Sequence, residues 1–457
     1  MQRSDQPAEQ GLWARHALLP EGWARDVRLG VREGRFAAVE PGVAAVAGDT
    51  RVDILVPGIG NLHSHAFQRG MAGLSEAGGG DSFWSWRDLM YRFLDRLTPE
   101  AMHAIAAQAY MEMLEAGFTR VGEFHYLHHD IDGGAYADRA EMAGRIAQAA
   151  GETGIGLTLL PVFYAQAGFG GLAPQPAQRR FLNDLDGFAE LLAGCRAHLA
   201  PLGDAVLGLA PHSLRAVTPA QLAALLDMGA GPVHIHIAEQ VGEVDACLAW
   251  SGQRPVAWLL DHAPVDPRWC LVHATHVDQG ERSGIAARGA VAGLCPITEA
   301  NLGDGVFPLP EFIAEGGRFG IGSDSNVLIN AAEDLRLLEY GQRLTRRARN
   351  VAAGEGTHST GRILFEAAVA GGAQALGVSG GLCVGAPADG VSLDADHPAL
   401  RARAGDAWLD SWLFAARSGG VDGVWRRGRQ LVAGGRHLHR TRISANYGAA
   451  LDCVLRG

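Results

Sequence analysis

The chain has 457 residues, of which 47% are hydrophobic and 19% are charged, so it holds more apolar material than one compact domain usually buries. Its formal net charge is -11 and all of its basic residues are arginine, because the sequence contains no lysine. This balance argues against nucleic acid and anionic membrane surfaces as partners, since both attract basic patches.

Two further absences lead us to expect a cytoplasmic protein. The start of the sequence has no basic segment followed by an apolar run, and no stretch reaches the roughly 18 uninterrupted apolar residues of a membrane span. The six cysteines are widely scattered without a CxxC pair, so we expect buried thiols and no disulfide framework.

The predicted elements begin with residues 25–39, where apolar and polar residues alternate around a glycine turn. From residue 54 onward, short apolar runs alternate with longer helical patterns, which is typical of βα units around a parallel sheet. Eight apolar runs predict strands: 54–62, 119–124, 155–163, 206–211, 232–237, 269–273, 290–295 and 318–323. The helical patterns between and after them include 100–116, 138–151, 181–199, 219–228 and 362–376.

Eight strands in this order predict an α/β fold, a (β/α)8 TIM-type barrel with residues 362–376 as its closing helix. Residues 422–434 repeat the alternating pattern of the N-terminal segment. We expect the two ends to pair into one small β-sandwich, so that residues 1–53 and 380–457 form a composite domain around a barrel of residues 54–379. The alternative is that the two ends are unrelated terminal extensions.

Polar residues occur where the predicted strands end, and the loops at these ends converge over one mouth in a (β/α)8 barrel. They are His63 and His65 after the first strand, His212 after the fourth, His236 at the end of the fifth with Glu239 just beyond it, His273 at the end of the sixth, and Asp324 after the eighth. This placement predicts a catalytic site at the mouth of the barrel.

His63 and His65 stand two residues apart on an extended segment, so both rings point to the same side and can bind one ion. With His236 and Asp324 they predict a metal site that leaves one position for a water molecule, which the ion acidifies. We expect one Zn2+ per chain, with Fe2+ as the alternative, because imidazole and carboxylate suit both metals.

This ligand pattern resembles the amidohydrolase superfamily, and the resemblance covers nearly the whole chain. Many binuclear members bridge their two metals with a carboxylated lysine after the fourth strand. Because this chain has no lysine, such a bridge is excluded and the single-metal deaminase branch is favoured. A bridging glutamate or cysteine stays open.

The resemblance and the residues agree on a hydrolytic deamination. Asp324 and His273 would accept and hold the proton of the attacking water, and Glu239 would carry a proton to the substrate nitrogen and then to the leaving amine. The competing interpretation of Glu239 is an exposed carboxylate at the start of a helix. His234 lies deeper on the same strand as His236, and we interpret it as a packed barrel histidine.

Four segments are more specific than the metal ligands: NLHSHAFQR at 61–69, DSFWSWR at 81–87, EFHY at 123–126 and PHSLR at 211–215. Together they are similar to the formimidoylglutamate deiminases within that superfamily. The similarity implies hydrolysis of N-formimino-L-glutamate to N-formyl-L-glutamate and ammonia, a step of histidine degradation.

Such a substrate is a small anionic amidine, so its site needs cations for the carboxylates and neutral polar groups near the reacting carbon. Arg87 and Arg215 follow the first and fourth strands, and each can bind a carboxylate in bidentate fashion. Gln68 and Tyr126 are the expected hydrogen-bond partners of the substrate, and His212 is an expected contact near the amidine. Each arginine alone can equally be a surface ion-pair residue.

Two other functions stay open at this point. A nucleobase or related heterocycle deaminase on the same scaffold would use aromatic stacking and neutral hydrogen bonds in place of two arginines. A non-catalytic barrel would have lost metal ligands, whereas every expected position is filled. We also expect a homodimer, and we interpret the glycine-rich loops 76–81 and 166–175 as lids over the mouth.

Overall fold

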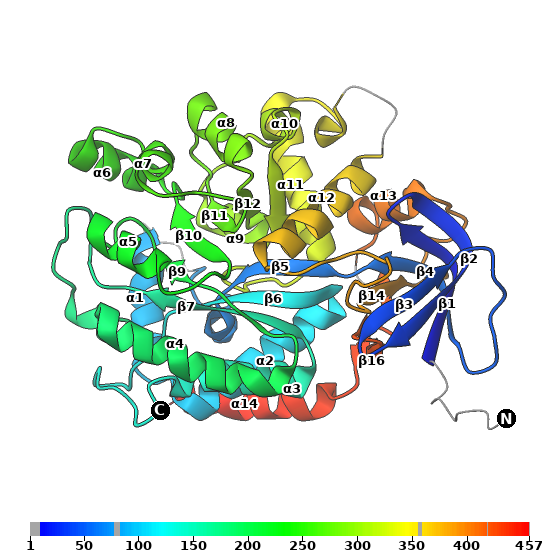
Figure 1. Cartoon of the computed structure of the whole chain (residues 1–457), viewed down its shortest axis with the longest axis horizontal. Helices are drawn as coiled ribbons and strands as arrows, with labels where there is room; N and C mark the ends of the chain where they lie inside the picture. The colour runs from blue at the N-terminus through cyan, green and yellow to red at the C-terminus, as the bar shows by residue number, and fades with distance from the viewer. Residues whose placement is uncertain (1–9, 77–82, 355–358, 418, 457) are drawn as a thin grey trace.

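The computed structural model describes residues 10–76, 83–354, 359–417 and 419–456, except for the side chains of residues 83–88. Figure 1 shows a ring of strands surrounded by helices, with a second sheet at one side. No helix in the described part of the chain is long and apolar enough to cross a membrane.

The ring of strands is a closed parallel barrel. Hydrogen bonds run from β10 through β11, β12 and β13 to β5, and then through β6 to β7, which pairs with both β8 and β9. The ring closes where Leu209 and Ser213 bridge to Val233 and His236. The (β/α)8 class is therefore confirmed. The strands are β5 (Ile59–Ser64), β6 (Phe118–His125), β7 (Gly156–Phe163), β8 (Val206–Leu207), β9 (Ala210–Pro211), β10 (Val233–Ile237), β11 (Trp269–His273), β12 (Val291–Leu294) and β13 (Arg318–Ile321).

The first predicted strand is wrong in its extent. Residues 54–62 cover the end of β4 (Thr50–Pro57), which belongs to the other sheet, and the start of the barrel strand β5. The chain passes from one sheet to the other at Gly58, where a Cβ would lie only 2.3 Å from the side chain of Thr119. Because the chain is buried on both sides of this point, one continuous apolar run hides the change of sheet.

The fourth predicted strand is also wrong in its extent, because residues 206–211 form the two short strands β8 and β9. Gly208 lies between them and approaches the neighbouring chain closely, since a Cβ there would lie 2.6 Å from the carbonyl oxygen of Pro232. The interruption turns Ala210 and Pro211 toward the mouth end of β7, where they pair with Val162 and Phe163.

Helices cover the outside of the barrel, and the five predicted helical patterns correspond to α2, α3, α4, α5 and α12. Thr98, Asp184 and Thr218 cap α2, α4 and α5 by accepting a hydrogen bond from a backbone N–H of the first turn. The helices are α1 (Phe83–Leu94), α2 (Pro99–Glu115), α3 (Glu141–Thr153), α4 (Leu185–Leu199), α5 (Pro219–Leu226), α6 (Val241–Ser251), α7 (Pro255–His262), α8 (Gln279–Arg288), α9 (Pro296–Leu302), α10 (Leu309–Ala314), α11 (Ala331–Arg346), α12 (Thr360–Ala375), α13 (Asp406–Phe414) and α14 (Arg440–Arg456).

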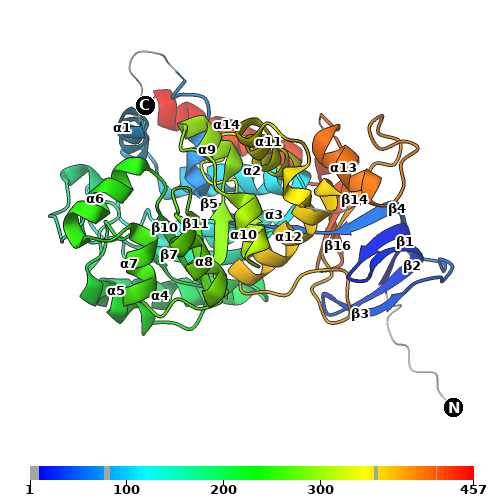
Figure 2. The ribbon, with the colours of Figure 1, turned by 90° about the horizontal axis from the view of Figure 1, so that it is seen from above.

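The second sheet joins the two ends of the chain, and both views place it beside the barrel (Figure 2). Its strand β14 lies antiparallel to β4, with Gly390 opposite Pro57. A separate apolar core forms where residues of β1 to β4 pack against Trp425. Its strands, in spatial order, are β17 (Arg436–His437), β16 (Arg429–Ala433), β15 (Val421–Arg426), β14 (Gly390–Leu393), β4, β1 (Gln10–Leu19), β2 (Gly22–Arg32) and β3 (Arg35–Glu40).

A group of ion pairs between two buried arginines and two partly buried aspartates links this sheet to the amino-terminal end of the barrel. We call Arg120, Asp204, Asp389 and Arg426 the base cluster. Asp204 Oδ2 lies 2.6 Å from Arg120 Nη2 and 2.5 Å from Arg426 Nη2, and Arg426 Nη1 lies 3.3 Å from Asp389. Burial raises the pKa of Asp204, but the two guanidinium groups outweigh it and hold that pKa below its ordinary value.

The C-terminal helix α14 lies along α2 and supports the segment after β5 (Figure 1). The hydroxyl of Tyr447 donates to the carbonyl oxygen of Arg69 at 3.3 Å, and Ser444 Oγ donates to Gln108 Oε1 at 3.2 Å. Arg69 belongs to the short 3-10 helix η1 (Ala66–Met71), which begins directly after His65. Helix α14 therefore holds the loop that follows the first two predicted metal ligands.

Candidate active site

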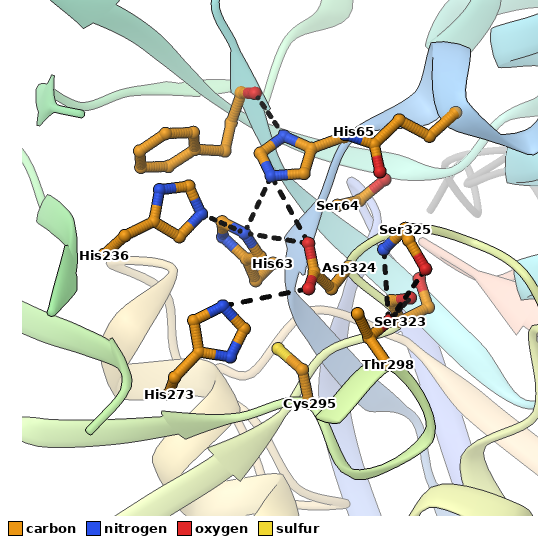
Figure 3. Close-up of polar contacts among 12 residues, drawn as sticks. His63, Ser64, His65, His236, His273, Cys295, Thr298, Ser323, Asp324 and Ser325 are labelled. Carbon is orange, nitrogen blue, oxygen red and sulfur yellow. Dashed lines mark hydrogen bonds and ion pairs between the residues drawn. The ribbon is translucent and has the colours of Figure 1, made fainter. Parts of the chain in front are cut away.

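Four predicted ligands meet at the carboxyl ends of β5, β10 and β13, and we call them the metal cluster. His63 Nε2 lies 3.2 Å from His65 Nε2 and 3.0 Å from His236 Nε2. Asp324 Oδ1 lies 3.4 Å from His63 Nε2 and 3.3 Å from His65 Nε2. All four side chains are buried, and Figure 3 shows their polar atoms turned toward one another.

The chemistry of these ligand atoms fits a divalent metal ion. His65 Nδ1 lies 2.9 Å from the carbonyl oxygen of Phe124, and His236 Nδ1 lies 3.2 Å from that of His212, so each donates its ring N–H outward. Burial lowers the pKa of His63 to about 3, so this ring is neutral. The Nδ1 donors leave Nε2 of His65 and of His236 as bare lone pairs that point toward His63 Nε2, an arrangement that a cation between the three atoms would stabilise. Four tetrahedral ligands about 2.1 Å from Zn2+ stand roughly 3.4 Å apart, close to the spacing observed here.

Hydrogen bonds hold the ligand loops in a strained backbone conformation. Asp324 and His273 have φ values of 45° and 68°, a region that costs residues other than glycine about 1–3 kcal/mol. Asn326 Nδ2 donates to the carbonyl oxygens of His65 and Asp324 at 3.0 and 3.1 Å, which ties the end of β13 to the end of β5. Ser323 Oγ donates to Asn326 Oδ1 at 2.6 Å and so fixes the orientation of this amide.

Close packing of glycine completes this support. Gly322 precedes the strained turn, and a Cβ on it would lie within 2.9 Å of the backbone nitrogen, the carbonyl oxygen and the Cβ of His63. Backbone atoms cannot rotate out of the way, so the position accepts no side chain without moving a metal ligand. The sequence around Asp324 therefore carries a structural requirement besides its ligand.

His273 and Glu239 lie beside the metal cluster. His273 Nε2 lies 3.8 Å from Asp324 Oδ2 and 3.9 Å from Glu239 Oε1. On the other side of the ring, His273 Nδ1 lies 3.3 Å from Glu299 Oε1, which orients the imidazole. Although burial favours the neutral ring, these three carboxylates raise the pKa of His273 to about 10. Burial raises the pKa of Glu239, so its carboxyl group holds a proton more tightly than a free glutamate does.

A cavity over the metal cluster is lined by Gln68, Tyr126, His212 and Arg215, four of the predicted substrate residues. Gln68 Nε2 donates to the hydroxyl of Tyr126 at 2.9 Å, whereas Gln68 Oε1 is buried and has no hydrogen-bond partner among the described residues. The rings of His212 and His236 lie 4.9 Å apart, so His212 borders the metal cluster directly. A molecule bound in this cavity could therefore donate a hydrogen bond to Gln68 Oε1 and reach the metal cluster at the same time.

Arg215 brings a cation to this cavity without an ion-pair partner. Among the described residues, no carboxylate oxygen lies within 4.0 Å of its guanidinium nitrogens, and its buried Nε makes no hydrogen bond. Burial disfavours the charge, but the more distant Glu243 and Glu239 raise the pKa of Arg215. Because a buried charged donor without a partner is costly, its position at the cavity wall fits the binding of an anion.

Three predictions fall wholly or partly outside these observations. The side chain of Arg87 lies outside the described residues, so its contact with a substrate stays a prediction. Loop 76–81 lies outside them as well, except for Glu76. In loop 166–175, Ala167 lines the cavity and the ring of Phe169 stacks on that of Trp250 at 5.5 Å. Its movement as a lid stays a prediction.

Several residues of the site were not predicted from the sequence. Tyr164 directly follows the predicted strand 155–163, so the position of a strand end could have found it. Glu299 lies in α9, and Phe181 precedes α4, and neither has a local signal. His234 is packed as interpreted, with Nε2 2.8 Å from the carbonyl oxygen of Ala375. The remaining cavity residues without a prediction are Met90, Tyr91, Thr298, Leu302 and Ser325.

Comparison with known proteins agrees with this geometry. The profile described as "Amidohydrolase family" matches residues 54–431, and the one described as "Formimidoylglutamate deiminase HutF, N-terminal domain" matches residues 10–53. A formimidoylglutamate deiminase of Pseudomonas aeruginosa is 54% identical over 450 residues, which cover 97% of this chain and 99% of the relative. The crystal structure of an amidohydrolase from Brucella melitensis is 55% identical, with a TM-score of 0.94, over 98% of this chain and 100% of that chain.

A more distant relative represents the deaminases of heterocycles. The 5-methylthioadenosine/S-adenosylhomocysteine deaminase of Natronomonas pharaonis is 29% identical over 398 residues, which cover 84% of this chain and 83% of the relative. The chain is thus more similar to the amidine hydrolase than to this nucleoside deaminase.

Proposed function

The chain belongs to the amidohydrolase family, and from that membership we propose that it hydrolyses the formimino group of N-formimino-L-glutamate, releasing ammonia and N-formyl-L-glutamate in histidine degradation. The observation that carries the proposal is the guanidinium of Arg215, unpaired among the described residues, in the cavity that also contains His65, His236 and Asp324. A nucleobase would offer this cation no carboxylate, whereas formiminoglutamate offers two. The 54% identity to a formimidoylglutamate deiminase supports the same substrate.

The metal cluster is proposed to hold one Zn2+ ion, with Fe2+ as the alternative, since its ligands suit both metals. When bound, such an ion lowers the pKa of a coordinated water toward neutrality. A zinc ion that expands from four to five ligands would hold that water beside the three nitrogen ligands and the one carboxylate. The residues around it then have two tasks, which are proton transfer and the placement of the amidine carbon.

Glu239 and Asp324 are proposed to transfer the protons, assisted by His273. Asp324 accepts the proton of the attacking water, and the protonated ring of His273, whose Nε2 lies 3.8 Å from the Asp324 carboxylate, stabilises that carboxylate by its positive charge. Glu239 lines the same cavity and delivers its proton to the imine nitrogen. Its carboxylate then takes up the proton of the hydroxyl group on the tetrahedral carbon and delivers it to the amine that leaves. The second protonation is needed because a neutral ammonia molecule leaves the tetrahedral carbon far more readily than an amide anion.

The cavity residues are proposed to place the substrate. Arg215 binds one carboxylate in bidentate fashion, and Arg87 is proposed to bind the other. Gln68 Oε1, which has no hydrogen-bond partner among the described residues, accepts a hydrogen bond from the amidine N–H, while Tyr126 and His212 contact the substrate beside it. These contacts would orient the amidine carbon toward the metal cluster.

Other features stay predictions that this function makes reasonable. We propose a cytoplasmic homodimer whose only substrate class is small anionic amidines, without nucleic acid or membrane as partner. We also propose that residues 54–379 form the catalytic domain, and that residues 1–53 and 380–457 form the terminal domain.

The test is ammonia release by zinc-loaded protein from N-formimino-L-glutamate, measured beside guanine, cytosine and N-formimino-L-aspartate. We expect ammonia from formiminoglutamate with N-formylglutamate as the second product, and none from the two nucleobases. The shorter aspartate analogue should show a raised KM, because one methylene group fewer shortens the span between its two carboxylates. Ammonia from a nucleobase alone would contradict the substrate assignment while leaving the metal cluster unaffected.

A further inference from the structure

One buried arginine behind the cavity joins three segments that form its wall. Arg180 directly precedes the cavity residue Phe181, and it is among the largest side chains that are fully buried. We propose that Arg180 is a positioning residue, whose guanidinium holds this wall in the arrangement that binds the substrate. The proposal rests on the function proposed above, and it concerns a residue that does not itself touch the substrate.

The guanidinium of Arg180 donates hydrogen bonds to the backbone of two other segments. Its Nη1 and Nη2 donate to the carbonyl oxygens of Leu94, the last residue of α1, and Leu97, the latter at 3.0 Å. Its Nε donates to the carbonyl oxygen of His129 at 2.9 Å, in the loop after β6. The carbonyl oxygen of Arg180 in turn accepts the N–H groups of His128 and His129 at 2.9 and 3.1 Å. One residue therefore connects α1, the loop after β6 and the segment before α4.

These hydrogen bonds are costly to lose because the groups that form them are buried. Arg180 is 2% exposed, and among the described residues no carboxylate oxygen lies within 4.0 Å of its guanidinium nitrogens. Carbonyl oxygens therefore stabilise its charge, and that of Leu94 lies at the end of α1 where the helix dipole is negative. A side chain without these donors would deprive three carbonyl oxygens of a charged partner.

Each of the three segments contributes side chains to the same wall of the cavity. Met90 and Tyr91 come from α1, Tyr126 directly follows β6, and Phe181 precedes α4. The ring centroid of Phe181 lies 5.0 Å from that of Tyr126 and 6.1 Å from that of Tyr91. The hydroxyl of Tyr126 donates to Met90 Sδ at 3.2 Å. We call these four residues the aromatic wall, and Arg180 holds all three of its segments from behind.

The aromatic wall serves both ends of the substrate in the proposed function. Tyr126 is one of the proposed substrate contacts, and its ring lies 5.1 Å from that of the metal ligand His65. Helix α1 also contains Arg87, which is proposed to bind a substrate carboxylate. A displacement of this wall would change the binding of the substrate without removing a metal ligand. Misplacement of positioning groups by about 1 Å can cost about 100-fold in rate.

The experiment measures ammonia release from N-formimino-L-glutamate by zinc-loaded wild type, Arg180→Met and Arg180→Lys. Arg180→Met should lower kcat/KM by roughly 10-fold to 100-fold at unchanged zinc content. Most of this loss should be a raised KM, because none of the three hydrogen bonds of the guanidinium reaches a metal ligand. Arg180→Lys should recover only part of the loss, since an ammonium group lacks the fork of donors that serves three carbonyl oxygens.

Hydrogen exchange measured by mass spectrometry gives a readout that does not depend on activity. In Arg180→Met, the backbone amides of residues 89–94 in α1 should exchange at least about 10-fold faster, because the helix loses a charged hydrogen bond at its end. The amides of β10 and β13, which carry metal ligands, should exchange as in the wild type.

Arg336 offers a control with the same chemistry outside the site. It lies in α11 and donates to the carbonyl oxygens of Leu413 and Ala416 at the end of α13, both at 2.6 Å. Arg336→Met should lower thermal stability as Arg180→Met does, but KM and the exchange of α1 should stay at wild-type values.

Arg179 offers a control in the same place without burial. It pairs with Asp95 just beyond α1 at 2.6 Å, but 34% of its side chain is exposed. Because exposed ion pairs contribute little, Arg179→Met should resemble the wild type in KM, in stability and in the exchange of α1.

Three outcomes would overturn the inference: a wild-type KM in folded Arg180→Met, an equal rise of KM in Arg336→Met, or unchanged exchange of the α1 amides in Arg180→Met. If Arg180→Met does not fold, Arg180→Lys decides by the same two readouts. Failure of the proposed function looks different, because the wild type would then give no ammonia from formiminoglutamate while the faster exchange of α1 in Arg180→Met remained.

Discussion

The two ends of the barrel bury polar side chains in opposite ways. In the base cluster, Asp204 and Asp389 each have an arginine nitrogen within 3.3 Å. In the metal cluster, three neutral imidazoles face one another and share a single carboxylate. A buried polar group costs stability unless it is paired. The paired charges of the base cluster therefore stabilise the fold, whereas the polar atoms of the metal cluster stay available to bind a ligand.

The comparison shows that structural and functional polar residues differ in whether they are paired, and not in how deeply they are buried. Strand β6 contributes Arg120 to the base cluster near its start, and its last residues reach the site. Both ends of the strand are fully buried, so accessibility does not distinguish them. What distinguishes them is the guanidinium of Arg215, which has no ion-pair partner among the described residues, and the converging Nε2 atoms of the metal cluster. Substitutions at the two ends should therefore affect different quantities.

Glu239→Gln should have the largest effect and should affect only catalysis. We expect kcat to fall about 1000-fold, because general acid catalysis contributes between 100-fold and 10,000-fold. Zinc content and thermal stability should stay at wild-type values, since the substitution keeps the shape of a buried side chain whose pKa is raised. Steady-state ammonia release and thermal unfolding measure the two quantities.

The matched control is Glu281→Gln, in which a buried carboxylate outside the site loses its charge. Glu281 pairs with Arg254 at 2.7 Å and accepts the backbone N–H of Asp278 at 3.0 Å, as a paired structural group does. It should lower stability and leave kcat unchanged. A loss of kcat equal to that of Glu239→Gln would break the comparison between paired and unpaired groups.

Arg426→Met tests the opposite end. Removing this guanidinium leaves Asp389 without its nearest charged partner and should lower the free energy of unfolding by about 3 kcal/mol, with kcat of the folded enzyme unchanged. Its neighbour Arg427 lies 3.9 Å from Asp204 and has 38% of its side chain exposed, so Arg427→Met should cost less than about 1 kcal/mol. Urea denaturation compares the two, and equal losses would contradict a special role for the base cluster.

Arg215→Met sharpens the comparison at the site. Loss of a bidentate contact to a substrate carboxylate should raise KM roughly 30-fold, equivalent to about 2 kcal/mol, with little change in kcat. Stability should not fall, because the substitution removes a charge that has no ion-pair partner among the described residues. In the control Arg254→Met, KM should stay constant while stability decreases. If Arg215→Met were strongly destabilised but had a normal KM, the role of this arginine would be structural and it would not bind the substrate.

The smallest effect concerns acid stability. Asp204 has a pKa held below its ordinary value by Arg426 and Arg120, against the effect of burial. Its pairing therefore stabilises the folded state at a pH above the unfolded pKa of about 3.9, and this contribution is lost as the pH falls through the folded pKa. Asp204→Asn should accordingly show a shallower loss of stability between pH 5 and strongly acidic pH, measured by urea denaturation. A slope equal to that of the wild type would contradict this pairing.

Much of this architecture could be predicted because the rules involved are local. The strands are short apolar runs, and each ligand of the metal cluster lies at or just beyond the end of such a run. Tyr164 obeys the same rule and was overlooked. The predictions failed where two sheets bury the same run, as at Gly58, since periodicity reports burial and not the identity of the neighbour.

The remaining parts of the site depend on contacts between distant segments. Glu299 gains its role only because β12 lies beside β11, which brings it to His273. Asn326 supports the site through the ends of β5 and β13, strands at opposite ends of the barrel sequence. Neither contact has a signature in spacing or composition. A single sequence therefore allows us to predict which residues lie at the mouth of the barrel, but not which side chains hold them in place.

The pairing of β4 with β14 has a consequence for synthesis of the chain. Strand β4 leaves the ribosome before every barrel strand, whereas its neighbour β14 follows all of them. Until then, one edge of β4 is unpaired, with the apolar residues Ile54 to Val56 beside it. Such an edge can pair with another nascent chain. Ribosomes that stall within the barrel should therefore leave a product with this edge exposed, which is prone to aggregate.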